Sequence, residues 1–227
     1  MRPTLRLACV VAAGVLALPA LARAGEEQNA PPPRKPVSIG LRAYGIFDYD
    51  NLAAKESFEA VLGTSQLKAF GGGVEVVDLW KHVFVRAAVT RARKTGTRGF
   101  VSGSEFFPNG IELTMTMTPI EAGAGWRFVS KQGSRFTPYA GVSFLSVGYT
   151  ETSKFADPAD NTSESFKGQA VFGGVEIGVL KGLTVTAEAQ YRRVPNALGA
   201  GGVSKDFGET DLGGVTARIT IGIRTRR

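Results

Sequence analysis

The stretch GVTARITIGIR, residues Gly214–Arg224, decides the fold of this chain. Every second residue from Val215 to Ile223 is apolar, whereas the residues between them are Thr, Arg or Gly. Because successive side chains of a β-strand point to opposite sides, this alternation predicts a strand with one apolar and one polar face. A tilted strand of about ten residues is long enough to cross the hydrocarbon core of a bilayer.

About seven further stretches upstream show the same alternation. They lie at roughly Val37–Tyr49, Lys68–Asp78, Val83–Arg91, Glu112–Phe128, Phe136–Tyr149, Gln169–Leu180 and Leu183–Arg193. The connections after the second, fourth and sixth strands are short. Those after the first, third, fifth and seventh strands run about sixteen to twenty residues. Short periplasmic turns alternating with longer external loops are typical of bacterial outer-membrane barrels. The sequence therefore predicts an all-β fold, an eight-stranded antiparallel up-and-down transmembrane β-barrel with four long external loops.

The start of the chain has the features of a secretion signal. A basic beginning with Arg2 and Arg6 is followed by an apolar run, Leu7–Leu21, and then by Ala22-Arg23-Ala24. This order is that of a Sec signal peptide with an Ala-x-Ala cleavage site. We expect a signal peptide over residues 1–24, a Pro-rich polar lead-in over 25–36, an outer-membrane barrel domain over 37–227, and location in the outer membrane of a Gram-negative cell.

Charge and cysteine content exclude several classes of function. The formal net charge is +7, and removal of Arg2, Arg6 and Arg23 with the signal peptide leaves +4 without a clustered basic patch. A nucleic-acid partner is therefore not expected. The only cysteine, Cys9, lies in the predicted signal peptide, so the mature chain has no disulfide, zinc thiolate or catalytic thiol. We expect no cofactor and no metal site.

Charged residues occur singly on the polar faces of the predicted strands. They are Arg42, Glu75, Arg86, Glu121, Arg127, Glu176, Glu188 and Arg218. Four are basic and four acidic, and their neighbours on that face are mostly small residues that fit a narrow eight-stranded lumen. Because buried charges must be paired, we expect these side chains to face inward and to close the lumen as ion pairs. The alternative is a solvated sheet face with scattered charges.

Aromatic residues gather near the ends of the apolar faces. The candidates for interfacial positions are Phe47, Tyr49, Trp80, Trp126, Phe128 and Phe136. Membrane barrels carry such aromatic girdles at both interfaces, although strand ends in soluble cores are also aromatic.

These features resemble the small outer-membrane β-barrel domain family of Gram-negative bacteria, which includes the membrane domain of outer-membrane protein A. The resemblance rests on the signal peptide, the eight alternating strands and stretches such as FTPYAGV, Phe136–Val142, and it covers about Val37–Arg227. It implies the barrel architecture rather than an activity. Many members end in an aromatic residue that the assembly machinery recognises, whereas this chain ends Ile223–Arg227.

The sequence does not predict an enzyme. Barrel deacylases that resemble this architecture use a His-x-Ser motif on a strand, whereas the single histidine here begins His82-Val83-Phe84 in a short turn. Without a nearby serine, nucleophilic catalysis is not expected.

The expected function is that of an integral outer-membrane barrel with a structural or surface-interaction role. The expected partners are outer-membrane lipid, the barrel-assembly machinery and periplasmic chaperones, and the expected state is a monomer. Two alternatives remain open: a small ion or solute pore, and a soluble periplasmic lipocalin-like binder of apolar ligands.

Overall fold

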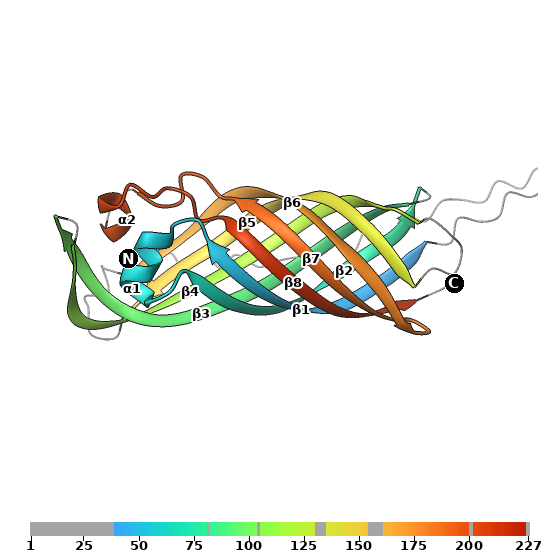
Figure 1. Cartoon of the computed structure of the whole chain (residues 1–227), viewed down its shortest axis with the longest axis horizontal. Helices are drawn as coiled ribbons and strands as arrows, with labels where there is room; N and C mark the ends of the chain where they lie inside the picture. The colour runs from blue at the N-terminus through green and yellow to red at the C-terminus, as the bar shows by residue number, and fades with distance from the viewer. Residues whose placement is uncertain are drawn as a thin grey trace, which may run out of the picture. The chain divides into compact units, whose positions relative to one another are not determined.

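The computed structural model describes residues 39–80, 82–103, 105–129, 135–153, 161–199 and 202–225. The predicted signal peptide, residues 1–24, and the predicted lead-in, residues 25–36, lie outside the described residues. Within the described ranges, eight strands pair in chain order, and β1 pairs with β8 to close a barrel (Figure 1). Every pairing is antiparallel, so the predicted eight-stranded up-and-down barrel is confirmed.

Eight strands and two short helices make up the described part of the chain. The strands are β1 (Gly40–Leu52), β2 (Gln66–Leu79), β3 (Val83–Ser102), β4 (Glu105–Arg127), β5 (Phe136–Thr152), β6 (Thr162–Leu180), β7 (Leu183–Arg193) and β8 (Gly214–Thr225). The helices are α1 (Lys55–Leu62), after β1, and α2 (Gly202–Asp206), after β7. Neither helix has the length and apolar character needed to span a membrane.

The two ends of the barrel differ in their connections. The ends of β2, β4, β6 and β8 and the starts of β1, β3, β5 and β7 lie at one end of the barrel (Figure 1). We call this the turn end. Both helices and the tip of the β3–β4 hairpin lie at the opposite end, which we call the loop end.

Two of the long connections are built differently from the prediction. The stretch 92–110, predicted as a loop, is mostly strand, because β3 and β4 stay paired as far as Ser102 and Glu105. The stretch 150–167 is likewise shortened, since β5 ends at Thr152 and β6 begins at Thr162. These extensions carry polar residues on both faces, so they lack the apolar alternation on which the strand assignment depended.

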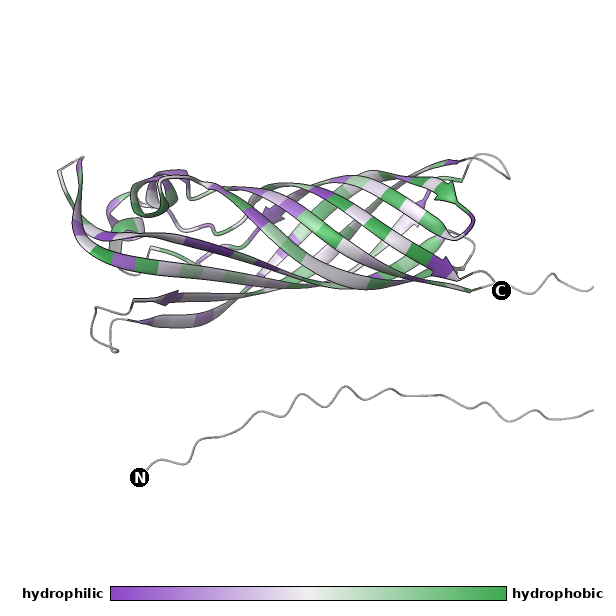
Figure 2. Ribbon diagram, turned by 90° about the horizontal axis from the view of Figure 1, so that it is seen from below, coloured by the Kyte–Doolittle hydropathy of each residue, from purple (hydrophilic) through white to green (hydrophobic). Residues whose placement is uncertain are grey.

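The apolar face of the strands points outward. On β8, Val215, Ile219 and Ile223 are 50–68% exposed, whereas Thr216, Arg218 and Thr220 on the other face are at most 4% exposed. Figure 2 shows hydrophobic residues alternating along the strands in the half of the barrel nearer the turn end. Outward aliphatic residues form a band around the barrel there.

Polar residues end this band on its loop-end side. The first polar outer positions beyond it are Lys68, Arg91, Thr118, Ser146, Gln169 and Arg193. Phe70, the last apolar outer residue on β2, pairs with Arg91 on β3, so the change of character on these two neighbouring strands differs by one outer position. The band therefore has a defined height rather than fading along each strand.

Candidate functional site: a charged lumen closed at the loop end

The eight charged side chains that the sequence assigns to the lumen are all buried. Their exposed fractions lie between 2% for Glu121 and 7% for Arg86. The others are Arg42, Glu75, Arg127, Glu176, Glu188 and Arg218. Strand alternation places them inside because their neighbours on each strand occupy the apolar outer band. The ion pairs divide them into two clusters.

The turn-end cluster consists of Arg42, Glu75, Arg127 and Glu176. Arg127 lies 3.0 Å from a Glu75 carboxylate oxygen and 2.5 Å from a Glu176 oxygen. Arg42 lies 3.4 Å from Glu75 and donates hydrogen bonds to the hydroxyl oxygens of Thr184 and Thr220. Each guanidinium is thus held by groups from more than one strand, as a buried cation requires.

The central cluster lies further along the lumen around Arg86 and Arg218. Arg86 contacts Glu121 and Glu188, both at 2.5 Å. Arg218 contacts Asp48 at 2.8 Å and Glu121 at 2.9 Å. Glu121 therefore joins the two guanidinium groups, and the cluster connects β1, β3, β4, β7 and β8 across the lumen.

Three residues of the central cluster were missed as site residues. Arg192 pairs with Asp48 at 3.1 Å and Asp50 at 3.0 Å, and all three are buried. Asp48 and Asp50 follow Arg42 at even spacing on β1, and Arg192 follows Glu188 on β7. The alternation that identified the other lumen charges would therefore have identified these as well.

An aromatic cluster of Phe84, Tyr139 and Phe172 fills the lumen between the ionic clusters. The Arg127 guanidinium lies 5.7 Å from the Phe84 ring centroid, and the Arg86 guanidinium lies 3.5 Å from that of Phe172. Phe84 and Tyr139 meet edge to face at 5.8 Å. These geometries are typical of attractive cation–π and aromatic contacts.

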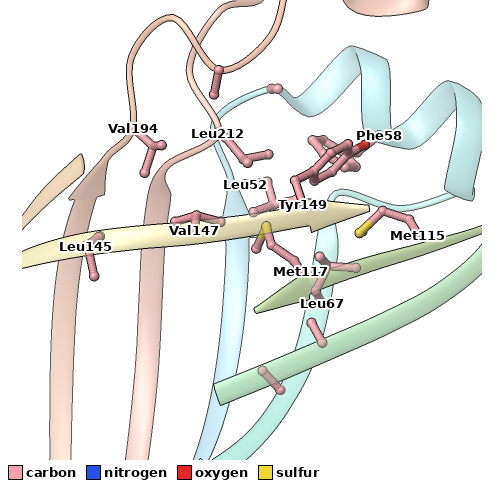
Figure 3. Packing of buried hydrophobic residues seen from close by; sticks show 14 of the residues in the cluster. Leu52, Phe58, Leu67, Met115, Met117, Leu145, Val147, Tyr149, Val194 and Leu212 are labelled. Carbon is pink, nitrogen blue, oxygen red and sulfur yellow. The ribbon is translucent and has the colours of Figure 1, made fainter. Parts of the chain in front are cut away.

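An apolar plug closes the lumen at the loop end. It includes Leu52, Leu67, Met115, Met117, Leu145, Val147, Tyr149, Val194, Leu212 and, from α1, Phe58 (Figure 3). On β1 the inner face changes from Asp50 to Leu52, and on β7 the chain continues from Arg192 to Val194. The plug therefore lies directly beyond the central ionic cluster. In the sequence, the plug could have been recognised by the change from charged to apolar residues at the inward-facing positions near the strand ends.

The six predicted interfacial aromatics lie on the outside of the barrel. Trp80, Trp126, Phe128 and Phe136 are 43–88% exposed at the turn end. Tyr49 is 37% exposed at the other edge of the apolar band, and Phe47 is half-buried against Phe70 at 5.2 Å between ring centroids. These residues mark both edges of the band.

The described residues contain no group of three or more metal-ligating side chains arranged to hold a metal ion. His82 lies in the β2–β3 turn, where its ring packs edge to face on Trp126 at 5.5 Å.

Comparison with known proteins finds similarity to solved structures only. No family model and no curated protein sequence matches it. Among solved structures it is similar to Neisserial surface protein A (TM-score 0.48, 12% identity, covering 83% of this chain and 97% of that one). It is also similar to Ail of Yersinia pestis (0.43, 13%, 83% and 97%) and to the N-terminal β-barrel domain of Pseudomonas aeruginosa OprF (0.40, 12%, 83% and 98%). The barrel fold itself rests on the closed pairing of the eight strands.

Proposed function

We propose that this chain is an integral barrel of a Gram-negative outer membrane with a structural or surface-interaction role. The observation that carries the proposal is the inverted arrangement of its faces, with aliphatic side chains outside and ion pairs inside. A soluble lipocalin-like barrel needs the opposite arrangement, because its apolar face must line the interior. A closed barrel also satisfies its backbone groups internally, which the bilayer core demands.

In this proposal the turn end faces the periplasm and the loop end faces the outside of the cell. Outer-membrane lipid surrounds the apolar band, and periplasmic chaperones and the barrel-assembly machinery deliver the chain as a monomer. We propose no catalytic role and no cofactor.

Heat modifiability tests the membrane assignment. The full chain is expressed in a Gram-negative host, outer membranes are isolated, and boiled and unboiled samples are compared on a denaturing gel. We expect a folded band that migrates differently when unboiled and that resists carbonate extraction. A soluble periplasmic band with unchanged migration after boiling would overturn the proposal in favour of a soluble binder.

The alternative of a small pore is tested by conductance across planar bilayers. The apolar plug and the paired lumen charges support a closed barrel, because an eight-stranded lumen filled by side chains leaves little open space. We expect no steady channel currents from the wild-type protein or from Glu121→Gln and Arg218→Gln variants. Steady unit currents that either substitution changes would show that the lumen conducts.

A further inference from the structure

The outer face of the barrel carries basic residues where the apolar band ends towards the loop end. They are Lys68 on β2, Arg91 and Arg93 on β3, Lys167 on β6 and Arg193 on β7. All five are exposed, and each lies on the face that carries the aliphatic residues of its strand. A surface of this kind attracts anionic groups to the edge of the band.

Lys68, Arg91 and Arg93 are neighbours on this surface, and we call them the basic triad. Arg91 is directly opposite Phe70, and Lys68 is two residues from Phe70 on β2, so Lys68 and Arg91 form a diagonal pair. Diagonal pairs on one face of a sheet are about 7–8 Å apart, and residues two apart on one strand are separated by about 7 Å. Three long cationic side chains can therefore reach one anionic group placed between them.

The basic triad differs from the other two cations in having no ionic partner among the described residues. Arg193, by contrast, lies 3.9 Å from Asp211, and Lys167 donates a hydrogen bond to the hydroxyl of Ser146 at 2.8 Å. Like charges that are held close together on a sheet repel each other. An anion bound at the triad relieves this repulsion.

The surroundings of the basic triad do not neutralise it. The residues next to it and opposite it on the same face are uncharged: Gln66, Phe70, Val89, Thr95, Tyr49 and Thr116. Of the carboxylates at the loop end, Glu112 of β4 is opposite Thr97, four residues beyond Arg93. The carboxylate of Glu59 on α1 accepts the Ser65 hydroxyl at 3.1 Å. The triad therefore remains a positively charged patch.

The basic triad adjoins the apolar band directly. Phe70 pairs with Arg91, and Val89 precedes Arg91 by two residues on the same face. These two apolar side chains are 64% and 47% exposed. Long basic side chains at such a boundary keep their charged ends at the level of the lipid headgroups. A lipid can thus place its anionic headgroup on the triad while its chains cover the band.

The number of cations indicates the kind of headgroup. A phosphate monoester carries a charge of about −1.5 to −2 at pH 7, whereas a phosphodiester carries less. Arginine guanidinium groups bind phosphate oxygens in a bidentate manner, and lysine adds a point charge. Three neighbouring cations therefore match a monoester better than a diester or a zwitterionic headgroup.

We propose that the basic triad of Lys68, Arg91 and Arg93 binds the phosphate-monoester headgroup of a lipid in the leaflet around the loop end. The site rests on the membrane location proposed above and adds to it a class of headgroup and a position on the barrel.

Native mass spectrometry of the folded full barrel in detergent tests the proposal. Dioleoyl phosphatidic acid, phosphatidylglycerol and phosphatidylcholine are titrated separately, so that only the headgroup varies. We expect one phosphatidic acid per barrel, bound at least tenfold more tightly than phosphatidylcholine and at least threefold more tightly than phosphatidylglycerol. Inorganic phosphate at the same concentration should not displace it, because the ion gains nothing from the apolar band.

Two double variants with the same change of charge locate the binding site. Lys68→Gln with Arg91→Gln should weaken phosphatidic acid binding at least tenfold, since each cation near an anionic headgroup contributes roughly fivefold. Lys167→Gln with Arg193→Gln is the matched control, because Arg193 pairs with Gln169 and is thus diagonal to Lys167 in the same way. The control should change the affinity less than twofold.

Equal weakening by the two double variants would overturn the proposal, because the basic edge as a whole would then attract the lipid. Equal binding of phosphatidic acid and phosphatidylcholine would also overturn it, as would displacement by an equal concentration of inorganic phosphate, which would indicate a site for the free ion. Each protein is first checked for the heat-dependent band shift. A folded barrel without headgroup preference contradicts the triad site alone, whereas a chain that does not fold in membranes contradicts the membrane location as well.

Discussion

Arg218 illustrates what a single buried charge contributes to this barrel. Its guanidinium contacts Asp48 at 2.8 Å, Glu121 at 2.9 Å and Glu188 at 3.8 Å, three carboxylates from three other strands. Removal of one member of such a network leaves the remaining charges buried without a partner, which usually costs more than the intact network gains.

Arg218→Leu should therefore lower the free energy of unfolding by about 3–5 kcal/mol, the usual cost of breaking a buried ion pair. Urea titration in lipid vesicles, followed by the heat-dependent band shift, measures the change. Arg193→Leu on β7 is the control, since the Arg193 side chain is 64% exposed and 3.9 Å from Asp211. Equal effects of the two substitutions would contradict the assignment of Arg218 to a buried network.

Gly125 of β4 provides a second test at the residue scale. A Cβ at this position would lie 2.4 Å from the Phe84 ring and 2.6 Å from the Ala140 carbonyl oxygen. Gly125→Ala should cost about 1–3 kcal/mol of stability, as overpacking of a core does. Gly45→Ala is the control, because nothing lies within 4 Å of a Cβ there, and it should change stability by less than about 0.5 kcal/mol. Thermal unfolding of both variants measures the difference.

At the scale of the element, the β3–β4 hairpin extends beyond the neighbouring strands. β2 and β3 are paired only as far as Ala69 and Ala92, and β4 and β5 only as far as Thr114 and Thr152. The hairpin tip therefore does not take part in closing the barrel, and its residues Arg98, Gly99 and Asn109 line a cavity at the loop end.

Replacement of residues 98–111 by Asn-Gly should leave the barrel folded. Thr97 and Glu112 are directly paired, so a two-residue turn can join them. The shortened protein should keep its band shift and unfold within about 1 kcal/mol of the wild type, because surface segments away from the core contribute little. Failure to form a folded band would show that the hairpin is needed for barrel closure.

Helix α1 depends on a carboxylate supplied from another part of the chain. Glu209→Ala removes the acceptor of the Glu56 and Ser57 amides and should cost about 0.5–2 kcal/mol locally, as loss of a cap does. Hydrogen exchange followed by mass spectrometry should show faster exchange in residues 55–62 and unchanged exchange in β8. Uniform acceleration across the strands would instead show that this contact supports the whole barrel.

At the scale of the whole molecule, period-two alternation was sufficient to predict the barrel and its inward charges. Gly214–Arg224 alone carries both faces, and Arg42, Glu121 and Arg218 lie at the buried positions that the pattern gives them. Alternation does not predict which charged side chains form ion pairs, because the partners can be far apart in the chain. Arg218 and Glu121, for example, are 97 residues apart. It also fails beyond the bilayer-length segment, where polar residues on both faces conceal strands such as Thr162–Gln169.

The central claim is that the aliphatic face of the strands contacts lipid. Spin labels placed one at a time at positions 215–223 of β8, in vesicles, test it through their collision rates with oxygen and with a water-soluble nickel complex. The only cysteine, Cys9, lies in the predicted signal peptide, so single-cysteine variants of the barrel carry one label each. The account predicts high oxygen and low nickel accessibility at 215, 217, 219, 221 and 223, and low accessibility to both at the positions between. Low oxygen accessibility at the odd positions with high nickel accessibility at the even ones would contradict it, because the aliphatic face would then lie inside a soluble barrel.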